Sequence, residues 1–217
     1  MGSVAIIGAS RGIGLGFARS YTQDGWEVHA TTRNLENPGE LGKTKGNISL
    51  YQLEVRDRQQ IFELAVQFFD RGLDLLIHNA GVYENSLAYE AVMAINSEAP
   101  FNVIKALFPA VLRSKTKKIA ILTSQMGARN GGTTPSGIYG KSKCALNDRF
   151  RETELSWRSC GITAVVFHPG WVFTDMGGHG APVSVEESVT GMRAQIELMT
   201  PKNSGSFLTW KGDRHPW

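Results

Sequence analysis

Apolar residues along the chain follow two patterns that alternate from one end to the other. Short continuous apolar runs are typical of strands in a parallel sheet, because such strands are buried on both faces. Longer segments with an apolar residue every three or four positions are typical of helices with one buried side. The runs predict seven strands, at residues 4–7, 27–32, 48–55, 73–77, 118–123, 162–167 and 206–210. The helical spacing predicts helices at residues 13–23, 58–71, 88–112 and 185–199, and one that carries residues 139–146.

Strands that alternate with helices predict an α/β fold. We expect a single-domain Rossmann fold over residues 1–217, with a doubly wound, mostly parallel seven-stranded sheet and helices on both faces. Glycine and polar residues predict loops at 37–47 and 127–137. Ligands bind such sheets at the carboxyl ends of the strands. Five residues fall at those ends, so one crevice could hold Gly8, Arg33, Asn79, Ser124 and Pro169.

Tyr139 and Lys143 are four residues apart, so on a helix their side chains lie on the same face. A nearby ammonium group favours the phenolate and lowers the pKa of a tyrosine from about 10, which suits a general acid. A surface pair that steadies a helix end has the same spacing. The pair therefore assigns no function unless the rest of the chain supports it.

The first predicted strand is followed directly by the turn Gly8-x-x-x-Gly12-x-Gly14. Glycines at a strand-to-helix turn let a ligand approach the backbone, and the N-terminus of the following helix attracts a pyrophosphate. The spacing differs from the commoner Gly-x-Gly-x-x-Gly, and a glycine-rich turn without a ligand is the simpler alternative. The position immediately after a strand favours nucleotide binding.

Arg33 lies nineteen residues beyond Gly14, at the end of the second predicted strand. In dinucleotide folds an acidic residue at this place binds the ribose 2′-hydroxyl, whereas an arginine accommodates a 2′-phosphate. No Asp or Glu occurs at residues 30–35, so the sequence favours NADP(H) over NAD(H). Arg11, inside the glycine turn, could contact the same phosphate. Each arginine alone is also compatible with a solvated surface residue.

The composition limits the classes of partner that the chain is expected to bind. Its 217 residues carry a formal charge of +3, with 41% hydrophobic and 20% charged residues, and the basic residues are scattered. We therefore expect no nucleic-acid or membrane partner. The longest apolar runs are far shorter than the roughly 18 residues that span a bilayer, and the N-terminal run is predicted to be a strand rather than a signal peptide. Cys144 and Cys160 are expected to be reduced helix residues, with no metal site, which favours a cytoplasmic protein.

Two polar residues interrupt apolar segments. Asn96 lies within the predicted helix 88–112, although asparagine competes for backbone hydrogen bonds and is a poor interior helix residue. His78 ends the fourth predicted strand, where a buried histidine with satisfied hydrogen bonds is commoner than a ligand, and we assign it no catalytic role. Asn96 therefore needs an explanation that packing does not give.

The chain resembles the short-chain dehydrogenase/reductase family over nearly its whole length. Six features occur in the family's order: Gly8-x-x-x-Gly12-x-Gly14, Asn79-Ala80-Gly81, Asn96, Ser124, Tyr139-x-x-x-Lys143 and Pro169-Gly170. Each is common alone, whereas the six together are specific. Within the family, residues 169–177, 185–188 and 216–217 resemble the C-factor and sniffer-type carbonyl reductases.

The resemblance implies a role for each matching residue. Tyr139 would donate a proton to a carbonyl oxygen as NADPH delivers hydride to the carbonyl carbon, and the reverse would oxidise an alcohol. Lys143 would hold the nicotinamide ribose and lower the pKa of Tyr139, and Ser124 would hydrogen-bond the substrate oxygen. Asn96 would bend its helix and position a water that links Lys143 to solvent. Asn79 would stabilise the sheet beside the cofactor.

The predicted sites follow from these roles. The catalytic residues are Asn96, Ser124, Tyr139 and Lys143. Thr174 is expected to contact the carboxamide of the cofactor. The full predicted cofactor-binding set is Gly8, Ser10, Arg11, Gly12, Ile13, Gly14, Arg33, Glu54, Val55, Asn79, Ala80, Gly81, Tyr139, Lys143, Pro169, Gly170, Val172 and Thr174.

Some positions depart from the family pattern. Ile7 replaces the usual threonine before the first glycine, which removes one hydrogen bond near the turn. Glu54 replaces an aspartate that usually meets the adenine, with Asp57 as a less certain substitute. Tyr139 lies fifteen positions beyond Ser124, so an enlarged substrate loop is expected there. The segment 174–185 is short and glycine-rich, which predicts a small, mobile lid and broad specificity.

Three functions remain open at this point. The leading hypothesis is an NADPH-dependent reductase of aldehydes or ketones. The alternative from another class is an NAD(P)-binding, C-factor-like signalling or regulatory protein with little turnover. A nucleotide-sugar epimerase or dehydratase is disfavoured, because 217 residues leave no room for an added substrate domain. Many relatives form homodimers or homotetramers through the helices containing Asn96 and Tyr139, although similar carbonyl reductases can be monomeric.

Overall fold

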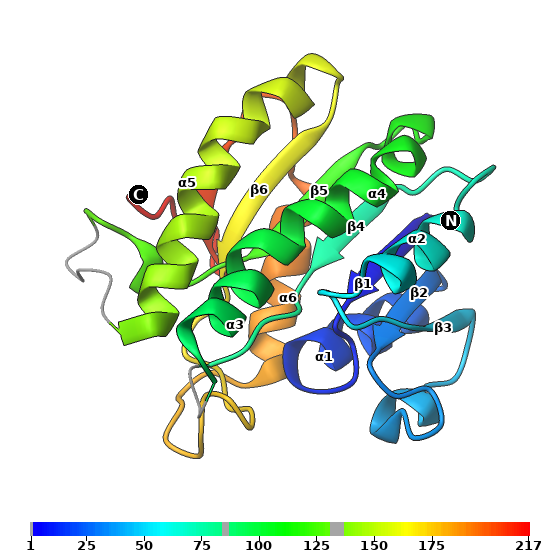
Figure 1. The fold of residues 1–217 in the computed structure, drawn as a ribbon, viewed down its shortest axis with the longest axis horizontal. Coiled ribbons are helices and arrows are strands. Elements are labelled where there is room, and N and C mark those ends of the chain that lie inside the picture. The colour runs from blue at the N-terminus through cyan, green and yellow to red at the C-terminus, as the bar shows by residue number, and fades with distance from the viewer. Residues whose placement is uncertain (1, 84–86, 131–136) are drawn as a thin grey trace.

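Seven parallel strands form one sheet in the computed structural model, which describes residues 2–83, 87–130 and 137–217 (Figure 1). The strand order is β3-β2-β1-β4-β5-β6-β7, so the direction of winding reverses between β1 and β4. The predicted doubly wound Rossmann fold is confirmed. The strands are β1 (Ser3–Ile7), β2 (Glu27–Thr32), β3 (Ile48–Gln52), β4 (Leu75–His78), β5 (Lys118–Leu122), β6 (Thr163–His168) and β7 (Ser206–Thr209).

Helices cover both faces of the sheet. The α-helices are α1 (Gly12–Gln23), α2 (Arg58–Val66), α3 (Tyr89–Met93), α4 (Ala99–Arg113), α5 (Gly137–Ser159) and α6 (Val185–Glu197). Side chains of α2, α4 and α5 belong to one core cluster, and side chains of α1 and α6 belong to the other. Figure 1 is viewed from the side of α4 and α5, with α6 behind the sheet.

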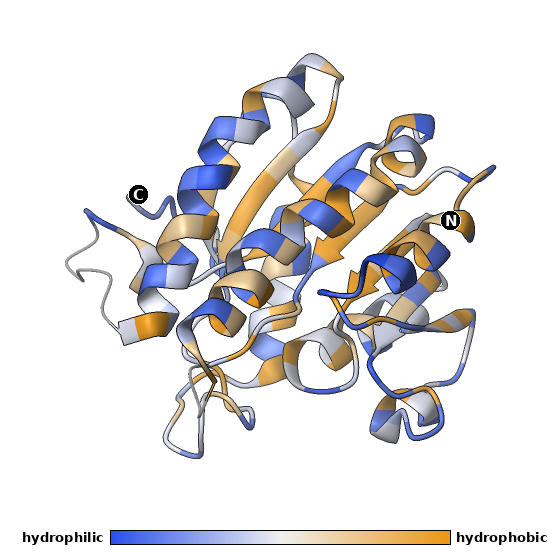
Figure 2. Cartoon of the chain, viewed as in Figure 1, coloured by the Kyte–Doolittle hydropathy of each residue, from blue (hydrophilic) through white to orange (hydrophobic). Residues whose placement is uncertain are grey.

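The central strand β1 shows why its sequence is continuously apolar. Ala5 and Ile7 point into the cluster with α2, α4 and α5, whereas Val4 and Ile6 point into the cluster with α1 and α6. A strand between two helical layers needs apolar side chains on both faces. Figure 2 shows the same contrast across the molecule, with apolar strands at the centre and polar residues along the outer sides of the helices.

Some predicted boundaries were wrong. The third strand ends at Gln52 rather than at residue 55, because the next residues leave the sheet toward the cleft described below. The second helix ends at Val66 rather than at 71, after which Phe68 turns into the core. The predicted loop 37–47 contains a short 3₁₀-helix, Gly39–Lys43, which buries Leu41.

The predicted helix 88–112 consists of three consecutive segments. Between α3 and α4 lies a turn of π-helix, Ala94–Glu98, and Asn96 is at its centre. Of the predicted loop 127–137, Gln125–Gly127 forms a 3₁₀-helix that overlaps its start, Gly137 begins α5, and residues 131–136 lie outside the described residues. Cys144 is buried in α5, whereas Cys160 is exposed just beyond the helix rather than within it, and both are free thiols.

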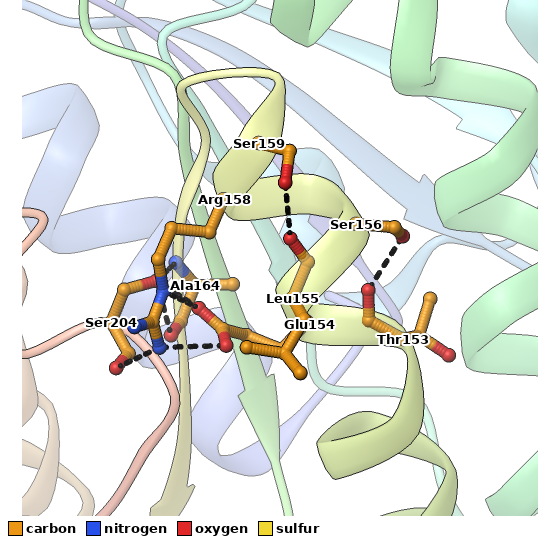
Figure 3. Close-up of polar contacts among 8 residues, drawn as sticks. All are labelled: Thr153, Glu154, Leu155, Ser156, Arg158, Ser159, Ala164 and Ser204. Carbon is orange, nitrogen blue, oxygen red and sulfur yellow. Dashed lines mark hydrogen bonds and ion pairs between the residues drawn. The ribbon is translucent and has the colours of Figure 1, made fainter.

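A buried carboxylate fixes the far end of α5 (Figure 3). Glu154 is 3% exposed and accepts hydrogen bonds from the Arg158 guanidinium at 2.8 and 2.9 Å and from Ser204 Oγ at 2.5 Å. Ser204 Oγ also accepts a bond from the Ala164 N–H in β6 at 3.0 Å. The cluster therefore ties α5 to β6 and to the turn that precedes β7.

We expect Glu154→Ala to lower the free energy of unfolding by about 1–3 kcal/mol, because the buried Ser204 hydroxyl and the Arg158 guanidinium lose their acceptor. Urea unfolding measures the change. Glu152→Ala, an exposed neighbour on the same helix, is the control and should change stability by less than about 0.5 kcal/mol. Equal unfolding midpoints for the two variants would contradict a structural role for the cluster.

Candidate active site

The glycine turn is held by contacts that leave no room for side chains. Gly8 has φ of 83°, and a Cβ there would lie 2.8 Å from Ala80 Cα. The Asn79 side chain donates a 2.6 Å hydrogen bond to the Gly8 carbonyl oxygen, so the end of β4 is tied to the turn. A Cβ on Gly14 would overlap that carbonyl and lie 2.6 Å from Asn79 Nδ2. Gly8 and Gly14 are therefore glycines because backbone and amide groups fill the space that a Cβ would need.

Thr31 hydrogen-bonds the glycine turn next to Ile7. The Gly8 N–H donates to Thr31 Oγ1 at 2.9 Å, so a hydroxyl from β2 serves the turn where the preceding residue has none. The sequence pattern did not single out Thr31. Its only signal was its place one residue before the carboxyl end of a strand.

The N-terminus of α1 is available to an anion. No side chain caps its first N–H groups, and its N-cap residue Arg11 has extended backbone. Exposed N–H groups and the positive end of a helix favour a phosphate. Arg11 turns its guanidinium to Asp175, 2.7 Å away, and both side chains are largely exposed. This ion pair, which joins residues 164 positions apart, was not predicted from the sequence.

Arg33 and Glu54 lie at the β2–β3 end of the same cleft. Burial raises the pKa of the Glu54 carboxyl, but hydrogen bonds from Arg56 and the charges of Arg56 and Arg33 outweigh it, so the pKa lies below its usual value. Arg33 is exposed and close enough to contribute to this shift. Asp57 accepts the N–H groups of Gln59 and Gln60 as the cap of α2, so its carboxylate is already used.

Asn96 joins three parts of the site. Its Oδ1 accepts the Val82 N–H at 2.9 Å, and its Nδ2 donates to the Val82 carbonyl at 2.8 Å and to Ser142 Oγ at 2.9 Å. The side chain is fully buried. A turn of π-helix is rare and occurs frequently at functional sites, and here it brings Asn96 against both the β4 extension and α5. Asn96 thus lies in a turn of π-helix, while the bend of the helix and the bound water stay predictions.

Tyr139, Lys143 and Ser124 lie together at the other end of the cleft. Lys143 is 4% exposed, its Nζ donates to the Leu122 carbonyl at 3.1 Å, and it lies 5.8 Å from the centre of the Tyr139 ring. Ser124 hydrogen-bonds the Tyr139 hydroxyl and also accepts the Met126 N–H at 3.1 Å. The predicted grouping of the three residues thus occurs in space.

The electrostatics of this group differ from the expectation. Burial raises the pKa of Tyr139 to about 12, against the opposing effect of its hydrogen bond with Ser124. Burial also lowers the pKa of Lys143 to about 8. The expectation that Lys143 holds the pKa of Tyr139 below 10 is not met, because burial of the phenol rather than Lys143 governs its pKa. Tyr139 is therefore a protonated donor at neutral pH.

A cleft of about 210 Å³ runs from the arginines to Tyr139. Of the predicted cofactor-binding residues, three do not line it: Gly14 and Val172 are buried behind it, and Gly170 packs against Trp210. Asn96 and Ser124 also lie behind the lining, in contact with Val82 and Tyr139. The predicted residues that line it are Gly8, Ser10, Arg11, Gly12, Ile13, Arg33, Glu54, Val55, Asn79, Ala80, Gly81, Tyr139, Lys143, Pro169 and Thr174.

Nine further lining residues were missed by the sequence interpretation. Most stand at or just beyond strand ends, a signal that could have found them, whereas Ile95, Asp175 and Met176 carried none. They are Thr31, Thr32, Leu53, Val82, Ile95, Leu122, Thr123, Asp175 and Met176.

The segment after β6, predicted as a small lid, has internal structure. Val172 and Val183 form a β-bridge, and the Trp171 indole N–H donates to the Gly177 carbonyl at 2.8 Å. Trp171, Phe173 and Met176 on this segment are exposed apolar residues, and Met176 lines the cleft. Met176 therefore adds an exposed apolar side chain to the lining of the cleft.

Comparison with known proteins identifies the family. A family model described as short chain dehydrogenase matches residues 3–181. The chain belongs to this family. It is 35% identical over 154 residues to the C-signal protein of Myxococcus xanthus, an alignment that covers 67% of this chain and 93% of that protein.

Solved structures of carbonyl reductases have the same fold. The carbonyl reductase Sniffer of D. melanogaster superposes with a TM-score of 0.88 at 26% identity, covering 100% of both chains. The NADPH-bound carbonyl reductase from chicken fatty liver superposes with a TM-score of 0.86 at 31% identity, covering 99% of this chain and 98% of that one. This short-chain dehydrogenase thus has both C-factor-like and sniffer-like relatives.

Two other kinds of site are absent from the described ranges, 2–83, 87–130 and 137–217. These residues contain no group of three or more His, Cys, Asp or Glu side chains that could hold a metal ion. None of the helices they form is long and apolar enough to cross a membrane.

Proposed function

We propose that this short-chain dehydrogenase is an NADP(H)-dependent oxidoreductase that reduces an aldehyde or ketone to an alcohol, or catalyses the reverse. The observation that carries the proposal is that Ser124, Tyr139 and Lys143 are grouped at one end of a cleft whose other end holds an uncapped helix N-terminus and Arg33. Its relatives include an NADPH-bound carbonyl reductase. The whole chain would act as one reductase domain on a small-molecule substrate.

The residues present fit NADP(H). The glycine turn offers close backbone approach and the free N–H groups of α1 to a pyrophosphate, and Arg33 offers a cation to a 2′-phosphate. Lys143, which lines the cleft, would bind the ribose hydroxyls, and Thr174 would contact the carboxamide. When bound, the cofactor supplies or accepts a hydride.

Tyr139 would move the proton. Its hydroxyl is protonated at neutral pH, as donation to a carbonyl oxygen requires. Ser124 holds that hydroxyl and would also donate to the same substrate oxygen, where negative charge develops. Asn96 holds Val82 against α5 and so keeps the wall of the cleft in place.

The test is NADPH oxidation by the purified protein with a panel of aldehydes and ketones. Turnover that depends on the carbonyl compound supports the reductase. The alternative, a regulatory protein with little turnover, is kept open by the similarity to the C-signal protein. Tight NADPH binding with negligible turnover across the panel would favour that alternative and overturn the reductase.

Cofactor preference tests the proposed role of Arg33. We expect the wild type to bind NADPH more tightly than NADH, and Arg33→Ala to raise the Kd for NADPH about 10–100-fold with little change for NADH, since one charge-assisted bond to phosphate is lost. Fluorescence titration measures both affinities. Arg58→Ala, an exposed arginine that does not line the cleft, is the control. A wild type that prefers NADH would contradict the assignment.

We propose that the protein is cytoplasmic. Two free cysteines, one of them exposed, are consistent with the reducing conditions of the cytoplasm. For assembly, we propose a homodimer or homotetramer through α4 and α5, with a monomer as the alternative. Size-exclusion chromatography with light scattering distinguishes these states.

A further inference from the structure

Tyr83 lies where the chain leaves the cleft, one residue beyond Val82. Val82 is fixed by two hydrogen bonds with Asn96, one to its N–H and one to its carbonyl. Asn96 in turn bonds Ser142 on α5, and Ser142 Oγ donates to the Tyr139 carbonyl at 2.7 Å. The backbone next to Tyr83 is therefore attached, through three consecutive contacts, to the turn of α5 that carries Tyr139.

The Tyr83 ring packs on the Tyr139 ring. Their centres are 4.9 Å apart and their planes are inclined by 39°, within the range of a favourable aromatic pair. Tyr139 lies in the first turn of α5, where a helix is least constrained by its own hydrogen bonds. Its hydroxyl stands at the end of a long side chain, so a small rotation of the ring displaces the oxygen. A packed neighbour limits that rotation.

The position of Tyr83 does not fit a general role in stability. Tyr83 is half-buried and belongs to neither core cluster formed by the described residues. A large aromatic residue outside the core usually has a local partner, and here that partner is Tyr139. The two phenols are also electrostatically coupled: after burial, Tyr83 is a further cause that raises the pKa of Tyr139.

We propose that Tyr83 is a positioning residue, whose ring holds the Tyr139 hydroxyl at Ser124 and in line with the substrate oxygen. The inference rests on the proposed reductase function, because it concerns the group that would transfer the proton. Displacing a reacting group by about 1 Å can reduce the rate about 100-fold. The effect of Tyr83 should therefore appear in kcat rather than in cofactor affinity.

The experiment compares Tyr83→Ala and Tyr83→Phe with wild type, using the carbonyl compound that the panel shows to be turned over best. We expect Tyr83→Ala to lower kcat at least about tenfold, with the Kd for NADPH unchanged within about twofold. Tyr83→Phe keeps the ring and should retain kcat within about threefold of wild type. Tyr89→Ala removes an exposed tyrosine at the start of α3 and should leave kcat unchanged.

Several results would overturn the inference. A wild-type kcat in Tyr83→Ala would show that the ring positions nothing, and an equal loss in Tyr83→Phe would show that the ring is not the part that matters. If Tyr83→Ala does not bind NADPH, Tyr83→Leu, which keeps apolar volume without a ring, replaces it with the same expected loss. A wild type that binds NADPH without turnover would remove both the function and the inference, whereas turnover by wild type and Tyr83→Ala alike removes the inference alone.

Discussion

Tyr139→Phe is expected to reduce kcat for carbonyl reduction by about 10²–10⁴-fold while NADPH still binds with nearly wild-type affinity. The substitution removes one oxygen atom and keeps the ring that packs on Tyr83 at 4.9 Å. The fold should be unaffected, and so should the glycine turn, which lies in another part of the cleft. What is lost is the hydroxyl that Ser124 hydrogen-bonds and that would donate the proton.

Single-turnover oxidation of NADPH with a carbonyl compound measures this loss without interference from product release. Tyr51→Phe is the matched control, because it removes the same atom from a tyrosine on β3 that does not line the cleft and whose hydroxyl pairs with His29. Tyr51→Phe should retain wild-type kcat. If both variants retained it, the proton would have to come from another group and the proposed role of Tyr139 would fail.

The sequence predicted most of the fold because both faces of the sheet are covered. A strand such as β1 must then be apolar at every position, which makes it easy to locate. The end of the third strand was less predictable, since Leu53 and Val55 are buried beyond the sheet, where they lie by the cleft. The spacing of apolar residues indicates which residues are buried, but not which part of the structure covers them.

The site was predictable at positions where the residue type itself indicates a particular backbone structure. Glycines with no space for a Cβ and an asparagine in an apolar helix both signalled an unusual backbone, and the structure has a tight turn and a turn of π-helix there. Contacts between distant segments carried no such signal. The Arg11–Asp175 ion pair and the hydroxyl that Thr31 gives to Gly8 depend on how strands and loops meet in space.

The pKa of Tyr139 could likewise not be predicted from the sequence. Helical spacing places Lys143 near the phenol, and that proximity alone predicts a lowered pKa. The depth at which the pair is buried is a property of the folded chain, and burial acts on both groups in the direction that disfavours charge. A spacing of four residues determines how close two side chains lie on a helix. Their desolvation depends instead on every segment that packs around them.

Gly14→Ala tests the glycine turn, because two physical effects predict opposite results. Gly14 lies within α1, and alanine is a better helix former than glycine by about 1 kcal/mol, so helix preference alone predicts a more stable protein. The added Cβ, however, would overlap the Gly8 carbonyl oxygen and lie 2.6 Å from Asn79 Nδ2. To relieve this overlap, α1 must move away from β1 or the hydrogen bond between Asn79 and Gly8 must break.

We expect the overlap to dominate, with Gly14→Ala lowering the free energy of unfolding by about 2–4 kcal/mol and weakening NADPH binding at least about tenfold. Urea unfolding and NADPH titration measure the two effects. Gly180→Ala is the control, because its Cβ would meet only the Trp171 ring, at an ordinary 3.7 Å, and stability should change by less than about 0.5 kcal/mol. A more stable Gly14→Ala with unchanged NADPH affinity would mean that the turn can relax at no cost, and that close contact between α1 and β1 is not what forms the cofactor site.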